Sequence, residues 1–197
     1  MAAGQRSQIF AVELANMAID TRVLAHGDLA PVARARLRAK LSSDVGVIGL
    51  LARARLQELR RRNPRLLTEI DRLQTAFRQG DQTKVAALID RLSRRYPVDT
   101  TGILPLDEAP SRLRAGRALY QNLCMGCHAY PDPASPAPAP DLFAMARSLP
   151  SADLVARLIG GVRGTPATTL VNPLRNRQIA DLAAYLKAGK SPKNVRR

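Results

Sequence analysis

Residues 124–128 of this chain read Cys-Met-Gly-Cys-His, and this segment decides how the sequence around it is interpreted. The spacing C-x-x-C-H is typical of covalent attachment of a c-type haem. Two thiols about one helical turn apart can each add to a vinyl group of one porphyrin, and the adjacent imidazole then lies beneath the iron. The motif uses both cysteines of the chain. It therefore predicts one covalent haem c, attached at Cys124 and Cys127, with His128 as an axial iron ligand.

Two other kinds of site also use closely spaced cysteines. A thioredoxin-like redox pair lies within a βαβ unit, and no strand-like alternation of apolar and polar residues is evident in the sequence. A tetrahedral zinc site needs four ligands, and only His128 and the distant His26 could join the two cysteines. These alternatives and a chance occurrence of the spacing stay open, but haem attachment is the favoured interpretation.

The sequence around the motif resembles a class I cytochrome c domain over about residues 111–190. The resemblance implies an all-helical haem domain whose first and last helices cross. It rests on four pieces in the family's order: residues 116–123 as the first helix with its small residue and following aromatic, Pro-Asp-Leu at 140–142 as the P-x-L after the haem loop, residues 161–166 as the loop before the distal ligand, and residues 178–186 as the terminal helix.

The resemblance implies roles for individual residues. Cys124 and Cys127 would carry the thioether bonds, and His128 would bind the iron through Nε2. The carbonyl of Pro140 would accept a hydrogen bond from Nδ1 of His128, which fixes the tautomer and the ring angle. Gly116 and Tyr120 would let the first helix pack closely against Tyr185 of the last helix.

The sequence departs from this family at the sixth iron ligand, which is usually a Met after Gly-Thr-Pro. Here Ala167 stands in that place, and no Met follows Met145. The iron is therefore expected to stay five-coordinate, to bind water, or to take a ligand from elsewhere. His26, Met17 and Met145 are the candidates within the chain, although each also fits a purely structural role.

Residues 1–95 resemble no family, and their apolar residues recur at helical spacing. Asn63, which is followed by Pro, and Asp81 are typical helix starts with a capping side chain. Ser43 or Asp44 is interpreted as a further cap, so a break between two helices is expected just before it. Four or five short antiparallel helices would form a bundle. We interpret this bundle as a docking or assembly module.

Proline-rich stretches divide the chain. Residues 96–110 hold three prolines and a glycine, which indicates a connector. Residues 131–140 hold five prolines, which indicates a stiff extended loop. The predicted fold is all-α: a helical bundle at 1–95, the linker, a cytochrome c-like haem domain at 111–190, and a basic tail at 191–197.

The chain is strongly basic, with 31 Lys and Arg against 16 Asp and Glu and a formal net charge of +15. Residues 53–65 hold the densest group of arginines. This balance favours anionic partners: an acidic redox protein, a larger oxidoreductase complex or an anionic membrane surface. For the arginines at 53–65 themselves, a solvated helix face is the favoured interpretation, and docking to an acidic redox protein comes next. Nucleic acid is disfavoured, because the chain has few aromatic residues for base stacking.

The favoured function is one-electron transfer by a mono-haem c-type cytochrome, acting as an electron carrier or as a subunit of a larger redox complex. The alternative is a haem protein that binds or senses a gas or other small ligand at an open sixth position. A third is a scaffold whose haem only stabilises the fold. No signal peptide is visible, since Glu13 and Asp20 interrupt the first 22 residues. Haem attachment nevertheless favours a periplasmic or otherwise exported protein.

Overall fold

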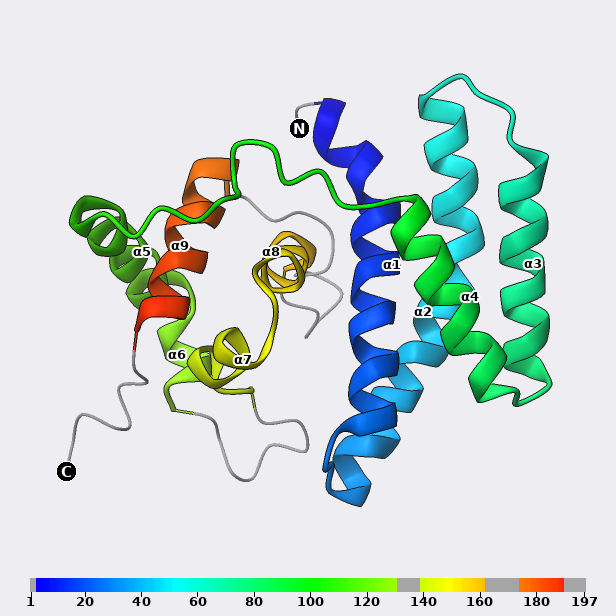
Figure 1. The fold of residues 1–197 in the computed structure, drawn as a ribbon, viewed down its shortest axis with the longest axis horizontal. Helices are drawn as coiled ribbons and strands as arrows, with labels where there is room; N and C mark the ends of the chain where they lie inside the picture. The colour runs from blue at the N-terminus through cyan, green and yellow to red at the C-terminus, as the bar shows by residue number, and fades with distance from the viewer. Residues whose placement is uncertain (1–2, 131–138, 162–173, 190–197) are drawn as a thin grey trace. The chain divides into compact units, whose positions relative to one another are not determined.

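A computed structural model describes residues 3–130, 139–161 and 174–189 (Figure 1). Within these residues the chain forms nine helices and no strand, so the predicted all-α fold is confirmed. The chain divides into two units, Met1–Asp99 and Thr100–Arg197. None of the helices in the described ranges combines the length and the apolar content that crossing a bilayer requires.

The N-terminal unit is a bundle of four helices. Helix α1 (Ala3–His26) packs against α2 (Pro31–Glu58) and α4 (Gln82–Arg95), and α3 (Pro64–Arg78) packs against α2 and α4. Their shared core is built from buried aliphatic side chains and from Phe10, whose ring meets that of Tyr96 edge-on at 5.5 Å. Burial of this apolar stripe stabilises the bundle, because short helices are marginal in water by themselves.

Two of the predicted caps are present. The side chain of Asn63 accepts a hydrogen bond from the Leu66 amide at 3.1 Å, and Asp81 accepts one from the Lys84 amide at 2.9 Å. The expected break before Ser43 and Asp44 is wrong, because α2 continues from Pro31 to Glu58. No Pro or Gly lies at residues 41–45 to interrupt the helix. Asp44 instead turns its carboxylate inward and does not cap a helix start.

Asp44 belongs to a buried polar group between α1 and α2. The ammonium of Lys40 lies 2.7 Å from a carboxylate oxygen of Asp20 and 2.7 Å from one of Asp44. Asp20, Asp44 and the nearby Glu13 are all at least 95 % buried. Burial raises the pKa of Asp44, the negative charge of Glu13 raises it further, and Lys40 opposes both effects. Lys40 therefore offsets part of the cost of burying Asp20 and Asp44.

Replacing Lys40 by Met should lower the free energy of unfolding of the bundle by about 3 kcal/mol at pH 7, because two buried carboxylates lose their cation. A raised pKa means that the folded state holds the proton of Asp44 more tightly than the unfolded chain. The contribution of Asp44 to stability therefore falls as pH rises above 3.8, its ordinary value. Without Lys40 the pKa of Asp44 should rise further, so this pH dependence should become steeper. The loss of stability relative to the parent chain should therefore be smaller near pH 4 than at pH 7.

Denaturant unfolding followed by circular dichroism at pH 7 and near pH 4 measures the effect, and hydrogen exchange in α1 and α2 locates it. The matched control is Lys84→Met, which removes an exposed lysine from α4 and should change stability by less than about 0.5 kcal/mol. Equal stability of the Lys40 and Lys84 variants at pH 7 would show that the buried group does not need its cation.

The second unit is built around the crossing of its first and last helices. Helix α5 (Pro110–Leu123) packs against α9 (Asn176–Ala188), and α9 also contacts α7 (Leu142–Ser148) and α8 (Ser151–Gly160). The short helix α6 (Met125–His128) follows α5. Before α5, Ile103 is 3 % exposed and joins the core of this unit. The chain is thus part of the second unit from about Thr100 onward.

Gly116 is the contact point of the crossing. A Cβ atom at this position would lie 2.1 Å from the backbone oxygen of Asp181 and 2.6 Å from Cβ of Tyr185. The two backbones therefore approach as closely as only glycine permits. Beside this point Tyr120 meets Phe143 edge-on with ring centroids 5.0 Å apart, and Tyr185 completes the group of rings. The close packing expected of Gly116 is present.

Candidate functional site

The Cys-Met-Gly-Cys-His segment forms one helical turn fixed to the end of α5. The Cys124 amide donates to the carbonyl of Tyr120 at 2.9 Å, and the His128 amide donates to the carbonyl of Cys124 at 3.0 Å. Tyr120 is 2 % exposed at the centre of the unit. The turn is therefore held by backbone hydrogen bonds to a residue that packing has immobilised.

The two thiols of the turn are free and differ in exposure. Cys124 is half-buried, and Cys127 is exposed. Burial raises the pKa of Cys124, and the nearby Cys127 raises it further. Redox-active pairs of the thioredoxin type lie within a βαβ unit. The absence of any strand within the described ranges disfavours that alternative.

His128 is oriented by a residue twelve positions further along the chain. Its Nδ1 atom lies 2.7 Å from the carbonyl oxygen of Pro140. A carbonyl can only accept, so Nδ1 carries the hydrogen. In the neutral imidazole this leaves a lone pair on Nε2, the nitrogen available to a metal ion.

The carbonyl of Pro140 is held in place by the start of α7. The side chain of Asp141 caps this helix, accepting hydrogen bonds from the amides of Phe143 at 2.9 Å and Ala144 at 3.2 Å. Phe143 is 1 % exposed and packs against the ring of Tyr120. The same core therefore positions both partners of the His128–Pro140 hydrogen bond.

Apolar surface flanks the turn on both sides. Leu123 is 58 % exposed and Tyr130 is 70 % exposed, and they are the large exposed apolar side chains in the described part of this unit. Exposed apolar surface next to polar groups commonly marks a ligand site. Two free thiols, an imidazole with Nε2 available and this apolar surface together fit a covalently bound haem.

Comparison with known proteins agrees with this geometry. Residues 111–186 match the family model described as cytochrome C oxidase, cbb3-type, subunit III. Residues 111–186 are a cytochrome c domain. The match covers less than half of the chain and leaves the N-terminal unit without a family. No curated protein and no solved structure matches the chain.

The cytochrome c domain holds one of the three candidates for the sixth iron ligand. Met145 lies on α7, half-buried against the domain core. Met17 is fully buried in the core of the N-terminal bundle, and His26 is the exposed last residue of α1. Ala167 and all but the first residue of the predicted loop 161–166 lie outside the described residues. Residues 131–138 of the proline-rich loop and the whole predicted tail 191–197 also lie outside them.

A separate metal site is not evident in the described part of the cytochrome c domain. No three His, Cys, Asp or Glu residues among those described are arranged to hold a metal ion, so Cys124, Cys127 and His128 do not converge as zinc ligands would.

Sequence reasoning missed the capping role of Asp141. Its signal was available, since an Asp directly before an apolar helical segment is a typical helix start.

Proposed function

We propose that this chain is a mono-haem c-type cytochrome that transfers one electron at a time. Cys124 and Cys127 would form the thioether bonds, and His128 would bind the iron through Nε2. The observation that carries the proposal is the 2.7 Å contact between Nδ1 of His128 and the carbonyl of Pro140, beside two free cysteines in a segment of the cytochrome c family. A bound haem c supplies a ferric–ferrous couple.

The residues of the domain would tune that couple. The Pro140 carbonyl accepts a hydrogen bond from His128, which increases the basicity of the imidazole and so strengthens its donation to iron. The aromatic core of Tyr120, Phe143 and Tyr185, to which the attachment turn is joined through Tyr120, would help to exclude water from a bound haem. Exclusion of water lowers the local dielectric constant, which is one of the factors that set a haem potential.

The partner we propose is an oxidase complex of the type named in the family description, or another oxidoreductase that presents an acidic surface. The formal net charge of +15 supports this, because complementary charge accelerates encounter. We infer that the N-terminal bundle serves docking or assembly. We place the protein in the periplasm or another exported compartment, because covalent haem attachment of this type favours one.

The sixth iron position separates electron transfer from the alternative, in which the haem binds a gas or another small ligand. No Met follows Met145 in the sequence, so for electron transfer with a filled sixth position the ligand would come from elsewhere in the chain. Met17 fills the bundle core, so its use as a ligand would require that core to open. His26 and Met145 could bind iron without such a rearrangement of a core, because His26 is exposed and Met145 is only partly buried.

A redox titration followed by optical spectroscopy tests this function on the full chain matured with haem. We expect one reversible transition with a slope of about 59 mV per tenfold change in the ratio of oxidised to reduced protein, the value for one electron. The reduced protein should respond little to carbon monoxide. Rapid and complete carbon monoxide binding would instead support the ligand-binding alternative, and the absence of any transition would support a purely structural haem.

A further inference from the structure

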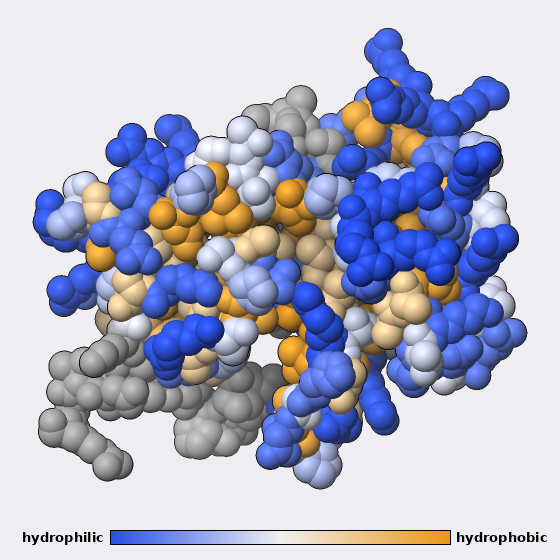
Figure 2. All heavy atoms as spheres, viewed as in Figure 1, coloured by the Kyte–Doolittle hydropathy of each residue, from blue (hydrophilic) through white to orange (hydrophobic). Residues whose placement is uncertain are grey.

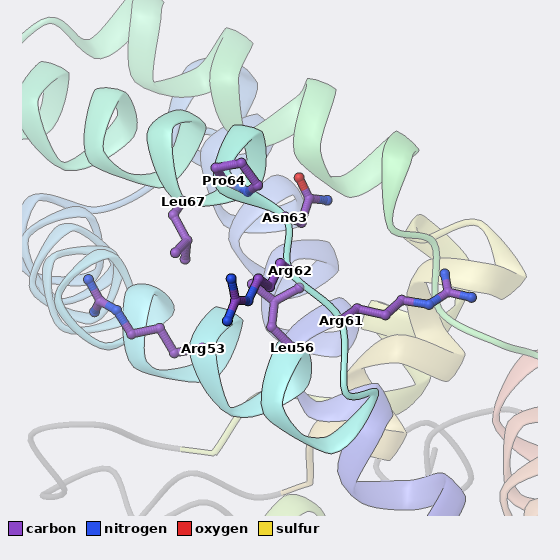
Figure 3. Close-up of a pocket in the computed structure, with 7 residues that line it drawn as sticks. All are labelled: Arg53, Leu56, Arg61, Arg62, Asn63, Pro64 and Leu67. Carbon is purple, nitrogen blue, oxygen red and sulfur yellow. The ribbon is translucent and has the colours of Figure 1, made fainter.

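A pocket in the N-terminal unit lies where α2 ends and α3 begins. The pocket has a volume of about 450 Å³ (Figure 3). Its lining consists of a few apolar side chains and a set of arginines, namely Leu56, Pro64 and Leu67 with Arg53, Arg61, Arg62 and the capping residue Asn63. Figure 2 shows apolar atoms (orange) between hydrophilic side chains (blue) at the upper right of the view.

The arginines of this pocket lack acidic partners. Arg53, Arg61 and Arg62 are exposed, and among the described residues none of them forms an ion pair. Elsewhere in the same bundle Arg95 pairs with Glu69 at 3.1 Å. In Figure 3 the head groups of Arg53 and Arg62 lie on either side of Leu67, whereas Arg61 extends away from them. Two unpaired guanidinium groups thus flank an apolar side chain.

The backbone at this turn is also strained. Arg60 has a φ of 49°, in the left-handed region where glycine or asparagine is usual. Its amide donates to the carbonyl of Gln57 at 3.1 Å, and the Arg61 amide donates to that of Leu56 at 2.9 Å, so hydrogen bonds hold the turn. Such strain persists where the surrounding structure fixes it, and it often accompanies binding sites. Here it places three consecutive arginines directly before the Asn63 cap of α3.

We propose that this pocket binds an acidic segment of a partner protein, with an apolar side chain inserted beside Leu56 and Leu67 and carboxylates on Arg53 and Arg62. The guanidinium group matches a carboxylate through two parallel hydrogen bonds. A concave apolar hollow accepts one anchoring side chain, as the centres of protein interfaces do. A lipid bilayer presents no such protruding group, and no aromatic side chain lines the pocket to stack on a base.

This inference rests on the proposed role of the bundle in docking, but it does not require haem on Cys124 and Cys127. Its test uses the haem-loaded full chain and a fluorescent peptide of Glu and Leu residues at helical spacing. The variant R53E/R62E should weaken peptide binding about tenfold, because two attractive charges become repulsive. The matched control R72E/R91E changes the net charge equally on exposed positions of α3 and α4 and should leave binding within about threefold.

Two further measurements decide the class of partner. A peptide with its leucines changed to serine should bind about tenfold less well if the hollow accepts an apolar side chain. Vesicles that contain phosphatidylglycerol should bind both charge variants equally. Failure of the Glu–Leu peptide to bind at low salt, equal losses in the two variants, or a loss of vesicle binding confined to R53E/R62E would each overturn the proposal. The redox titration is unaffected by these outcomes, so the two proposals fail separately.

Discussion

The double variant C124S/C127S should carry no covalent haem, whereas the parent chain matured in a haem-attaching host should carry one. A serine hydroxyl does not add to a porphyrin vinyl group under the conditions in which a thiol does, so both thioether bonds are lost. The fold should tolerate the change, because Cys127 is exposed and Cys124 is only half-buried. Mass spectrometry of the denatured proteins measures the difference directly. Each single serine variant should retain haem through its remaining thioether, at lower yield.

The control for this experiment lies inside the same turn. Met125→Leu conserves volume at a half-buried position between the two cysteines, so it should keep full haem attachment and cost less than about 1.5 kcal/mol. Two results would contradict the assignment of the site. One is haem that survives denaturation on the double serine variant. The other is a parent chain that leaves the same host with both thiols free.

Replacing Gly116 by Val should unfold the cytochrome c domain or destabilise it by about 4 kcal/mol or more, a loss that few single substitutions reach. The first added carbon alone would lie 2.1 Å from the Asp181 backbone oxygen, so α5 and α9 would have to separate. Valine adds two more carbons beside the same contact, which increases the clash. Gly116→Ala creates the same clash at Cβ, but a gain in helix propensity of about 1 kcal/mol offsets part of its cost. It should therefore destabilise the domain less than valine does.

Thermal unfolding of the haem-loaded chain, followed by haem absorbance, measures this loss in the cytochrome c domain. Gly126→Ala is the matched control, since a Cβ at Gly126 would meet nothing within 4 Å. It should change stability by less than about 1 kcal/mol. If Gly116→Val unfolds at the same temperature as the control, the helix crossing cannot be as close as described.

Local chemistry explains which features could be predicted from the sequence. The haem-attachment motif is contiguous, so its spacing indicates its chemistry directly. Asn63 and Asp81 were predictable as caps because a side chain that bonds the backbone three residues away needs only its own neighbours. The same reasoning failed at Asp44. The carboxylate of Asp44 pairs with Lys40 one helical turn earlier and is buried against α1, so it does not cap a helix. The sequence pattern of a helix cap includes neither of these contacts.

Contacts between distant residues required the folded chain or a family resemblance. The hydrogen bond from His128 to Pro140 was expected only because the family places a proline there, and Asp141 was not expected to hold that proline in place. The pocket beside Leu67 was not predicted at all. The arginine-rich run was visible in the sequence, but which of its members would flank an apolar hollow depends on how α2 turns into α3.

The sequence by itself therefore determined the helical fold class, the attachment motif and the basic character of this protein, because covalent spacing, hydrophobic periodicity and charge are properties of neighbouring residues. Only the tertiary structure decided that α2 is one continuous helix, that Asp44 is buried beside Lys40, and that Arg53 and Arg62 flank Leu67. These depend on side chains packed from separate helices, where the free energy of burial outweighs what each segment would favour alone.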